Sequence, residues 1–332
     1  MLLEFFLGAN SKKGFVSLYD TKNTERADDI YIIKGGPGTG KSTLMKRLSC
    51  KKSELTELLY CSSDPSSLDG VILHDEKRIE IYDGTAPHII EPRYPGAVEH
   101  YVDISKCWNT KKLKENRSEI IRLTNENKKC FEQAYNYTKS AGLCAEHILS
   151  TVITKVDIDK LNRKGTMLAK KYIKSKGSGG NEYKRFLSSI SPNGVILLEK
   201  SVFACEIIIK LNDLYNLSPF ILAPILKHAL LSKYDVFSCF CPLNPKKLEH
   251  IIIPELKLCF TTADVSAQKT VNFALPKEFK AECKFYKSCA EIFIEGAVKH
   301  LLSAKQIHDK LESLYTKNVD FKKMNKIYSD IT

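Results

Sequence analysis

GGPGTGKST, the stretch from Gly35 to Thr43, decides how the first part of this chain folds. An apolar run rich in β-branched residues, IYIIK (30–34), precedes it, and such a run is typical of a strand buried in a parallel sheet. Leu44 and Leu48 follow one helical turn apart, which predicts a helix packed on that sheet. Strand, glycine loop and helix in this order are the context of a phosphate-binding loop.

The residue types of this glycine loop each have a physical role. Glycines let the backbone wrap round phosphates and turn its N–H groups inward, and the helix that follows points its positive end at the same anion. Lys41 reaches the β- and γ-phosphates and is the first catalytic candidate, while the Ser42 hydroxyl is placed to coordinate Mg²⁺. The motif predicts bound ATP with Mg²⁺, held by Gly35, Gly36, Pro37, Gly38, Thr39, Gly40, Lys41, Ser42 and Thr43.

A hydrolysing site also needs an acid to hold the metal, usually at the end of a neighbouring strand. Asp83 ends the alternating run IEIYD (79–83), so we expect it to be the second catalytic residue and, with Ser42, a metal ligand. The alternatives are Asp64, after the apolar run 58–61, or a purely structural Asp83 in a turn with the glycine that follows it.

Three residues in the loop after Asp83 are weaker candidates for orienting water or sensing the terminal phosphate. They are His88, Glu91 and Arg93. A proline-rich loop around a buried histidine explains the same stretch without any catalytic role.

The chain also contains an internal repeat. CSSDPSSLDGVIL (61–73) matches CPLNPKKLEHIII (241–253) in its cysteine, proline, leucine, acid and apolar triplet. IIIK (207–210) repeats the strand before the glycine loop, but LNDLYNLS (211–218) then stands where the first copy has GGPGTGKS. Only the serine is retained, as Ser218, and Leu217 replaces the lysine. The position of Asp83 falls near Thr262 or Ala263, so the second copy has lost both the phosphate loop and the metal acid.

The repeat predicts an α/β fold of tandem P-loop NTPase-like domains with mostly parallel sheets, the second copy degenerate. We expect residues 1–173 to form the first domain, 174–184 a Gly- and Ser-containing linker, and 185–332 the second domain. Each domain is expected to end in a helical extension, the first around residues 113–135 and the second over 280–331, where apolar residues recur with helical spacing.

Composition narrows the class of protein. The formal net charge of +12 fits a lysine-rich surface or contact with nucleic acid, but no nucleic-acid-binding motif supports the second reading. Eleven cysteines without a C-x-x-C pair indicate reduced thiols, and Cys239 and Cys241 are expected on one face of a core strand. With no stretch suited to a signal or a membrane span, we expect a cytoplasmic protein without a membrane partner.

Several segments together resemble a known family. They are KGFVSLYD (13–20), IYIIKGGPGTGKSTLMKRL (30–48), CSSDPSSLDGVI (61–72) and DGTAPHIIEPRYPGAVEHYVDI (83–104). They are similar to bacterial tandem P-loop ATP-binding proteins of uncharacterised function. The resemblance implies ATP binding at the glycine loop and a role for Asp83-Gly84-Thr85. Both halves of that family carry P-loops, whereas this chain departs from the pattern at Leu211–Ser218.

These observations leave three functional hypotheses open. The first is an ATPase that converts hydrolysis into a conformational change on an unknown protein partner. The second is a nucleotide-dependent binding module with little turnover, and the third is a small-molecule phosphotransferase. No arginine follows Arg185, so the second domain proper has no arginine finger to offer.

Overall fold

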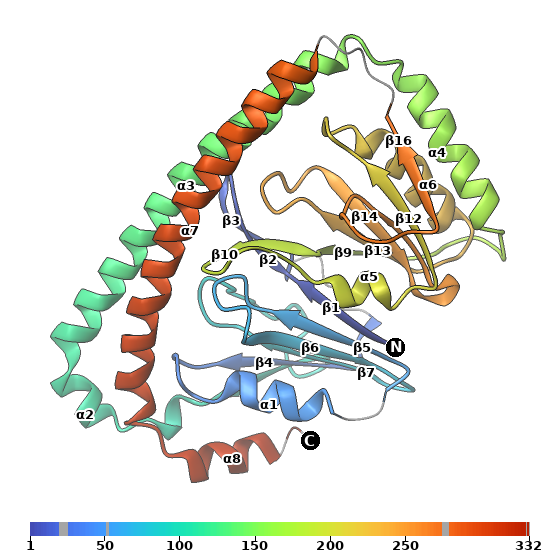
Figure 1. Ribbon diagram of the computed structural model, residues 1–332. Coiled ribbons are helices and arrows are strands. Elements are labelled where there is room, and N and C mark those ends of the chain that lie inside the picture. The colour runs from blue at the N-terminus through green and yellow to red at the C-terminus, as the bar shows by residue number, and fades with distance from the viewer. Residues whose placement is uncertain (20–25, 51–52, 274–278, 330, 332) are drawn as a thin grey trace.

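The computed structural model describes residues 1–19, 26–50, 53–273, 279–329 and 331 (Figure 1). These residues form a 12-stranded sheet in the order β16-β12-β15-β14-β13-β9-β1-β5-β6-β7-β4-β8, together with two small hairpin sheets. The expected α/β class is confirmed.

The N-terminal half of the chain contributes the elements from β1 to α4. They are β1 (Leu2–Phe6), β2 (Gly8–Ser11), β3 (Gly14–Ser17), β4 (Asp29–Lys34), α1 (Lys41–Leu48), β5 (Leu55–Tyr60), β6 (Leu68–His74), β7 (Arg78–Asp83), β8 (Glu99–Asp103), η3 (Ser105–Cys107), α2 (Thr110–Glu115), α3 (Arg117–Ile153) and α4 (Ile158–Tyr172). The strands and the helix expected around the glycine loop are therefore present as β4, β7 and α1.

The C-terminal half contributes the elements from β9 to α8. They are β9 (Glu182–Phe186), β10 (Ser188–Ser191), β11 (Gly194–Leu197), α5 (Glu199–Phe203), β12 (Ile207–Asn212), α6 (Ser218–Leu231), β13 (Val236–Phe240), β14 (Leu248–Ile253), η4 (Pro254–Leu256), β15 (Leu258–Thr261), β16 (Lys269–Asn272), α7 (Lys280–Thr316) and α8 (Phe321–Ser329).

The two halves arrange their strands in the same way about the centre of the sheet. From the centre outward the N-terminal half runs β1-β5-β6-β7-β4-β8 and the C-terminal half runs β9-β13-β14-β15-β12-β16. Within each half every strand points the same way except the third from the centre, because β6 and β14 pair antiparallel with both neighbours. The sheets are thus mostly parallel, as expected. The halves meet where β1 and β9 pair antiparallel at Phe6 and Phe186.

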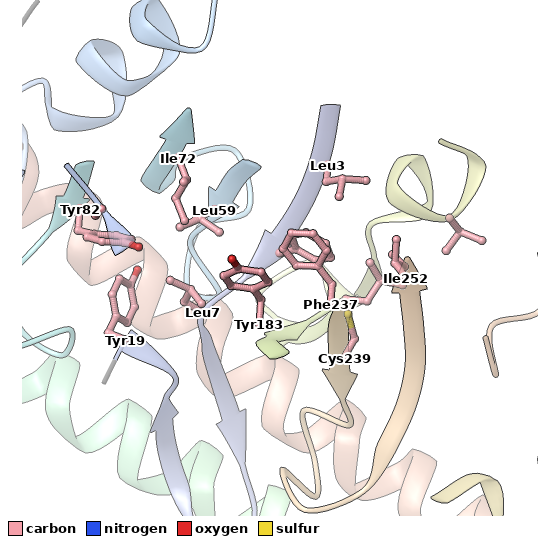
Figure 2. Close-up of a cluster of buried hydrophobic side chains, with 14 of the residues drawn as sticks. Leu3, Leu7, Tyr19, Leu59, Ile72, Tyr82, Tyr183, Phe237, Cys239 and Ile252 are labelled. Atoms are coloured by element: carbon pink, nitrogen blue, oxygen red, sulfur yellow. The ribbon is translucent and has the colours of Figure 1, made fainter. Parts of the chain in front are cut away.

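A single hydrophobic cluster crosses this junction (Figure 2). Its residues come from strands on both sides and include Leu3, Leu59, Ile72, Tyr82, Tyr183, Phe237, Cys239 and Ile252. Phe5 stacks on Phe237 with ring centroids 5.0 Å apart. Because burial of apolar area is the main stabilising term in folding, this shared core fixes the two halves to one another.

The long helices are exchanged between the halves. α3 and α7 lie side by side along one flank of the molecule, and we call this pair the helical arm (Figure 1). Beyond the arm, α4 packs into the core of the C-terminal half, where Leu168 and Ala169 contact the cluster around Ile221. In turn, Met324 and Tyr328 of α8 are buried in the core of the N-terminal half. The expected domain boundaries stay a prediction, and the packing crosses them in both directions.

Two local expectations need correction. The predicted linker 174–184 is irregular only to residue 181, since Glu182 begins β9, and the Gly180 N–H donates to the Leu230 carbonyl. Cys239 is fully buried in β13, but that strand ends at Phe240, so Cys241 lies just beyond it. In the described part of the chain, none of the helices combines the length and apolar character needed to cross a bilayer.

Candidate functional site

The glycine loop joins the end of β4 to the start of α1. Gly38 and Gly40 have φ angles of +68° and +72°, the left-handed region that favours glycine. A Cβ on Gly38 would lie 2.9 Å from the Glu312 carbonyl oxygen, so no larger residue fits there without a shift. Gly40 directly precedes α1, whose first-turn N–H groups have no partner within the helix. These glycines let the backbone turn sharply directly before the N-terminus of α1.

Lys41 folds back over this loop. Its Nζ donates to the carbonyl oxygens of Gly35 and Gly36 at 3.2 and 2.8 Å, and it lies 3.4 Å from Asp83 Oδ2. Only 11% of the Lys41 side chain is exposed. The cation is therefore held at the loop between backbone oxygens and a carboxylate.

Asp83 reaches the loop because β7 pairs parallel with β4, with Ile33 opposite Asp83. Carboxyl ends of parallel strands open at one edge of a sheet, where α/β proteins place ligands. The Thr85 N–H and hydroxyl both donate to Asp83 Oδ1. Burial raises the pKa of Asp83, while the Lys41 charge acts in the opposite direction. Ser42, the other predicted metal ligand, accepts from the Leu68 N–H at 2.9 Å.

These residues line one cavity of about 340 Å³, which lies within the size range of small-molecule sites. Its wall includes the glycine loop from Gly35 to Thr43 except Gly36, together with Asp64, Asp69, Asp83, Thr85 and His88. The helical arm also contributes to the wall, with Asn127 and Phe131 of α3 and Ala304, Lys305, His308 and Glu312 of α7. No arginine is among the described residues that line it.

The weaker candidates divide between the cavity and the surface. Asp64 lines the cavity and pairs with Lys305 at 3.3 Å. His88 also lines it and is buried, with its Nε2 2.9 Å from Asp69 Oδ2. Glu91 and Arg93 are exposed outside the cavity lining, so the structure does not bring them to the site.

Asp69 is a site residue that the sequence reasoning did not single out. Burial by itself lowers the pKa of His88. The charge and hydrogen bond of Asp69 outweigh this effect, so the pKa of His88 lies above its ordinary value. Ligand atoms of Cys61, Asp69 and His88 all lie within 4.8 Å of one another, an arrangement that also suits a metal ion. The internal repeat is the sequence feature that points to Asp69, because Asp69 in 61–73 aligns with the acid Glu249 in 241–253.

The second loop, Leu211–Ser218, keeps part of the backbone shape of the first. Asn216, which aligns with Gly40, has a φ of +61°, a region that asparagine tolerates better than most residues. The Ser218 hydroxyl donates to the Leu248 carbonyl, just as Ser42 contacts the backbone of Leu68. The repeat predicted from sequence thus places both serines at the start of a helix beside matching strands.

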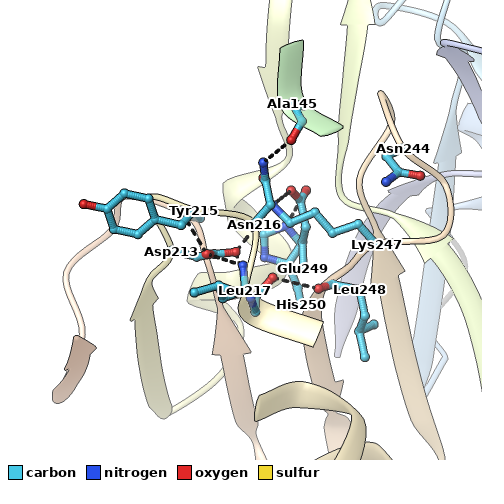
Figure 3. Close-up of polar contacts among 12 residues, drawn as sticks. Ala145, Asp213, Tyr215, Asn216, Leu217, Asn244, Lys247, Leu248, Glu249 and His250 are labelled. Carbon is cyan, nitrogen blue, oxygen red and sulfur yellow. Dashed lines mark hydrogen bonds and ion pairs between the residues drawn. The ribbon is translucent and has the colours of Figure 1, made fainter. Parts of the chain in front are cut away.

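An internal carboxylate fills the second loop (Figure 3). Asp213 accepts from the backbone N–H groups of Leu217 and Ser218 at 2.7 and 2.9 Å, and its side chain is fully buried. Lys247 Nζ lies 3.4 Å from the same carboxylate and 3.0 Å from Glu249. The helix N-terminus that would face a phosphate therefore already faces an anion of the chain.

The chain matches no protein-family model, no curated protein and no solved structure. The family resemblance noted in the sequence therefore stays a prediction, and the site is interpreted from its own residues.

Proposed function

We propose that the chain binds ATP with Mg²⁺ at the glycine loop and hydrolyses it to drive a conformational change. One observation carries the proposal: Lys41, Ser42 and Asp83 converge with the left-handed glycines on a single cavity. The glycine loop and its lysine supply the groups that phosphates need, and an acid on the neighbouring strand supplies what the metal needs.

The residues present fit Mg²⁺. This ion prefers oxygen ligands and is usually held by one or two carboxylates together with phosphate oxygens and water. The Ser42 hydroxyl and the Asp83 carboxylate offer such ligands at the edge of the cavity. When bound, the ion would neutralise charge on the phosphates.

In the proposed reaction a water molecule attacks the γ-phosphorus. The bond from that phosphorus to the oxygen shared with the β-phosphate breaks, the oxygen keeps the electron pair in ADP, and the proton of the water passes to the released phosphate or solvent. Lys41 stabilises the charge that gathers on the phosphate oxygens.

We further propose that the C-terminal half is a degenerate P-loop domain that binds no nucleotide. Its matching strand order and its filled second loop support that interpretation. All eleven cysteines are free thiols, which fits the proposed cytoplasmic location.

Among the alternatives, the cavity favours an ATPase over a phosphotransferase. Lids of small-molecule kinases usually carry several arginines, and none lines the cavity among the described residues. A nucleotide-dependent binding module with little turnover uses the same site and differs only in the rate of hydrolysis, so a turnover assay separates it from the ATPase.

Thermal unfolding with and without Mg·ATP tests the proposal. At one hundred times Kd, binding to the folded state contributes about 2.7 kcal/mol, a rise of several degrees in Tm. We expect Lys41→Ala to remove most of that rise, measured against the variant's own unliganded Tm, which should also fall because Asp83 loses its cation. Arg47→Ala, which changes an exposed cation on the same helix, is the matched control. An ATP-induced rise that persists in full in Lys41→Ala would refute the assignment.

A further inference from the structure

The arm helix α7 brings residues of the C-terminal half to the glycine loop. Ala304, Lys305, His308 and Glu312 lie on one face of α7, at spacings of three to four residues, and line the cavity. They originate more than two hundred residues away along the chain from the loop that they face.

The C-terminal end of α7 is packed directly on the loop backbone. The Thr316 hydroxyl donates to the Gly38 carbonyl at 3.3 Å, and the Tyr328 hydroxyl of α8 donates to the Thr39 carbonyl at 3.1 Å. A Cβ on Gly36 would lie 3.2 Å from the Tyr315 ring. The distance between this end of α7 and the glycine loop is therefore fixed by several contacts.

Lys305 is the cation that α7 places in the cavity. Its Nζ lies 3.3 Å from Asp64 Oδ2 and also pairs with Asp309 on its own helix. Burial lowers the pKa of Lys305, but hydrogen bonds and charges of Asp309 and Asp64 raise it above its ordinary value, so the side chain is charged at neutral pH. Among the described lining residues, Lys41 and Lys305 are the two lysines.

We infer that Lys305 contacts the terminal phosphate of the bound nucleoside triphosphate, from the part of the cavity wall that α7 forms. This inference rests on the proposed function. In many P-loop enzymes an arginine supplied from another domain stabilises charge on the transferred phosphoryl group. Here the C-terminal half has no arginine after Arg185, and a lysine on α7 occupies the corresponding face.

The contact links the nucleotide to the arm. With a terminal phosphate present, Lys305 exchanges Asp64 for a phosphate oxygen, and after hydrolysis and phosphate release it returns to Asp64. Because α7 carries Lys305 in the part that lines the cavity and packs against the C-terminal half near its N-terminal end, through Cys283, this exchange transmits the state of the nucleotide along the helix.

Equilibrium binding of ADP and of a non-hydrolysable ATP analogue, both with Mg²⁺, tests the inference in Lys305→Met. This variant keeps the length of the side chain and removes its charge. We expect the affinity for the analogue to fall about tenfold or more, the usual scale for a lost charge-assisted hydrogen bond, and the affinity for ADP to change less than twofold. ATP hydrolysis should fall at least tenfold, and Lys305→Arg should restore most of both.

Lys299→Met, which changes an exposed lysine on the same helix outside the cavity, should leave all these values unchanged. Equal losses for ADP and the analogue, or no loss for either, would overturn the inference about Lys305. Failure of the proposed function is a different result, since the wild-type protein would then bind neither nucleotide.

Discussion

The ion pair between Arg185 and Glu57 joins the two halves of the sheet, and Arg185→Ala measures what it contributes. Arg185 lies on β9 and Glu57 on β5, the strands on either side of β1. The guanidinium Nε and Nη2 each lie 2.8 Å from Glu57 Oε2. The two side chains are 5% and 0% exposed, so solvent cannot replace a lost partner.

The size of the effect follows from this burial. Removing one member of a buried pair typically costs about 3–5 kcal/mol, because the other charge is left uncompensated. His74 Nε2 still contacts Glu57 Oε1 at 2.8 Å in the variant, so we expect a loss of about 3 kcal/mol, at the lower end of the range.

The pH dependence provides a second measure of the pair. Burial by itself raises the pKa of Glu57, but the Arg185 charge and the His74 hydrogen bond lower it from 4.5 to about 2. A lowered folded-state pKa contributes stability above the unfolded-state value, and this contribution is lost as the pH falls from about 5 towards 2. Arg185→Ala should therefore flatten the fall in stability over that window.

Urea unfolding at pH 7 and at pH 4 measures both effects through the free energy of unfolding. Arg122→Ala is the control, because Arg122 forms exposed pairs with Glu119 and Glu126 on α3, and we expect no measurable change. Replacing Arg185 and Glu57 together by apolar residues should cost less than Arg185→Ala, since no charge stays buried alone. A loss below about 1 kcal/mol in Arg185→Ala would refute the reasoning.

Two further predictions concern the loops. Asp83→Asn should reduce Mg·ATP hydrolysis far more than magnesium-free nucleotide binding, because its carboxylate acts on the ion. If Asp64→Asn gives that pattern instead, Asp64 and not Asp83 is the acid that holds the metal. Asp213→Ala should lower the stability of the protein by about 2 kcal/mol, because the N–H groups of Leu217 and Ser218 lose their buried acceptor, while Lys247 keeps Glu249 as a partner. Sulfate or phosphate should then raise its Tm more than that of the parent, measured in a Lys41→Ala background so that the first loop does not contribute. A Tm equally insensitive to these anions in both proteins would contradict the carboxylate's role.

The parts of the site that were predicted from sequence are those set by short stretches of chain. The glycine loop, β4 and α1 are contiguous, and the spacing of apolar residues predicts them directly. Asp83 ends β7, a neighbour of β4, in agreement with the alternating run, because the end of such a strand is a local feature of the sequence. The roles assigned to these residues stay predictions.

The parts that were missed depend on contacts between distant segments. An amphipathic pattern in α7 predicts that one face is buried, but not that Lys305 faces the glycine loop. The same limit applies to α4 and α8. The apolar face of α4 packs on the C-terminal half, and that of α8 packs on the N-terminal half. Asp213 is not singled out by the sequence of the second loop, and only the structure places its carboxylate against the helix N-terminus.

The glycine loop and the second loop differ in the source of their anion. In the proposed mechanism this difference determines which end of the arm responds to the nucleotide. In the second loop the anion is the Asp213 carboxylate, which is part of the chain and cannot leave. Asn216 of that loop donates to the Ala145 carbonyl of α3, so this end of the arm rests on a permanently filled site. In the first loop the proposed anion is a nucleotide phosphate, which arrives and departs, and α7 rests there through Thr316. In the proposed mechanism, a change in bound nucleotide therefore acts on one end of the arm only, because the other end rests on a loop whose anion is part of the chain.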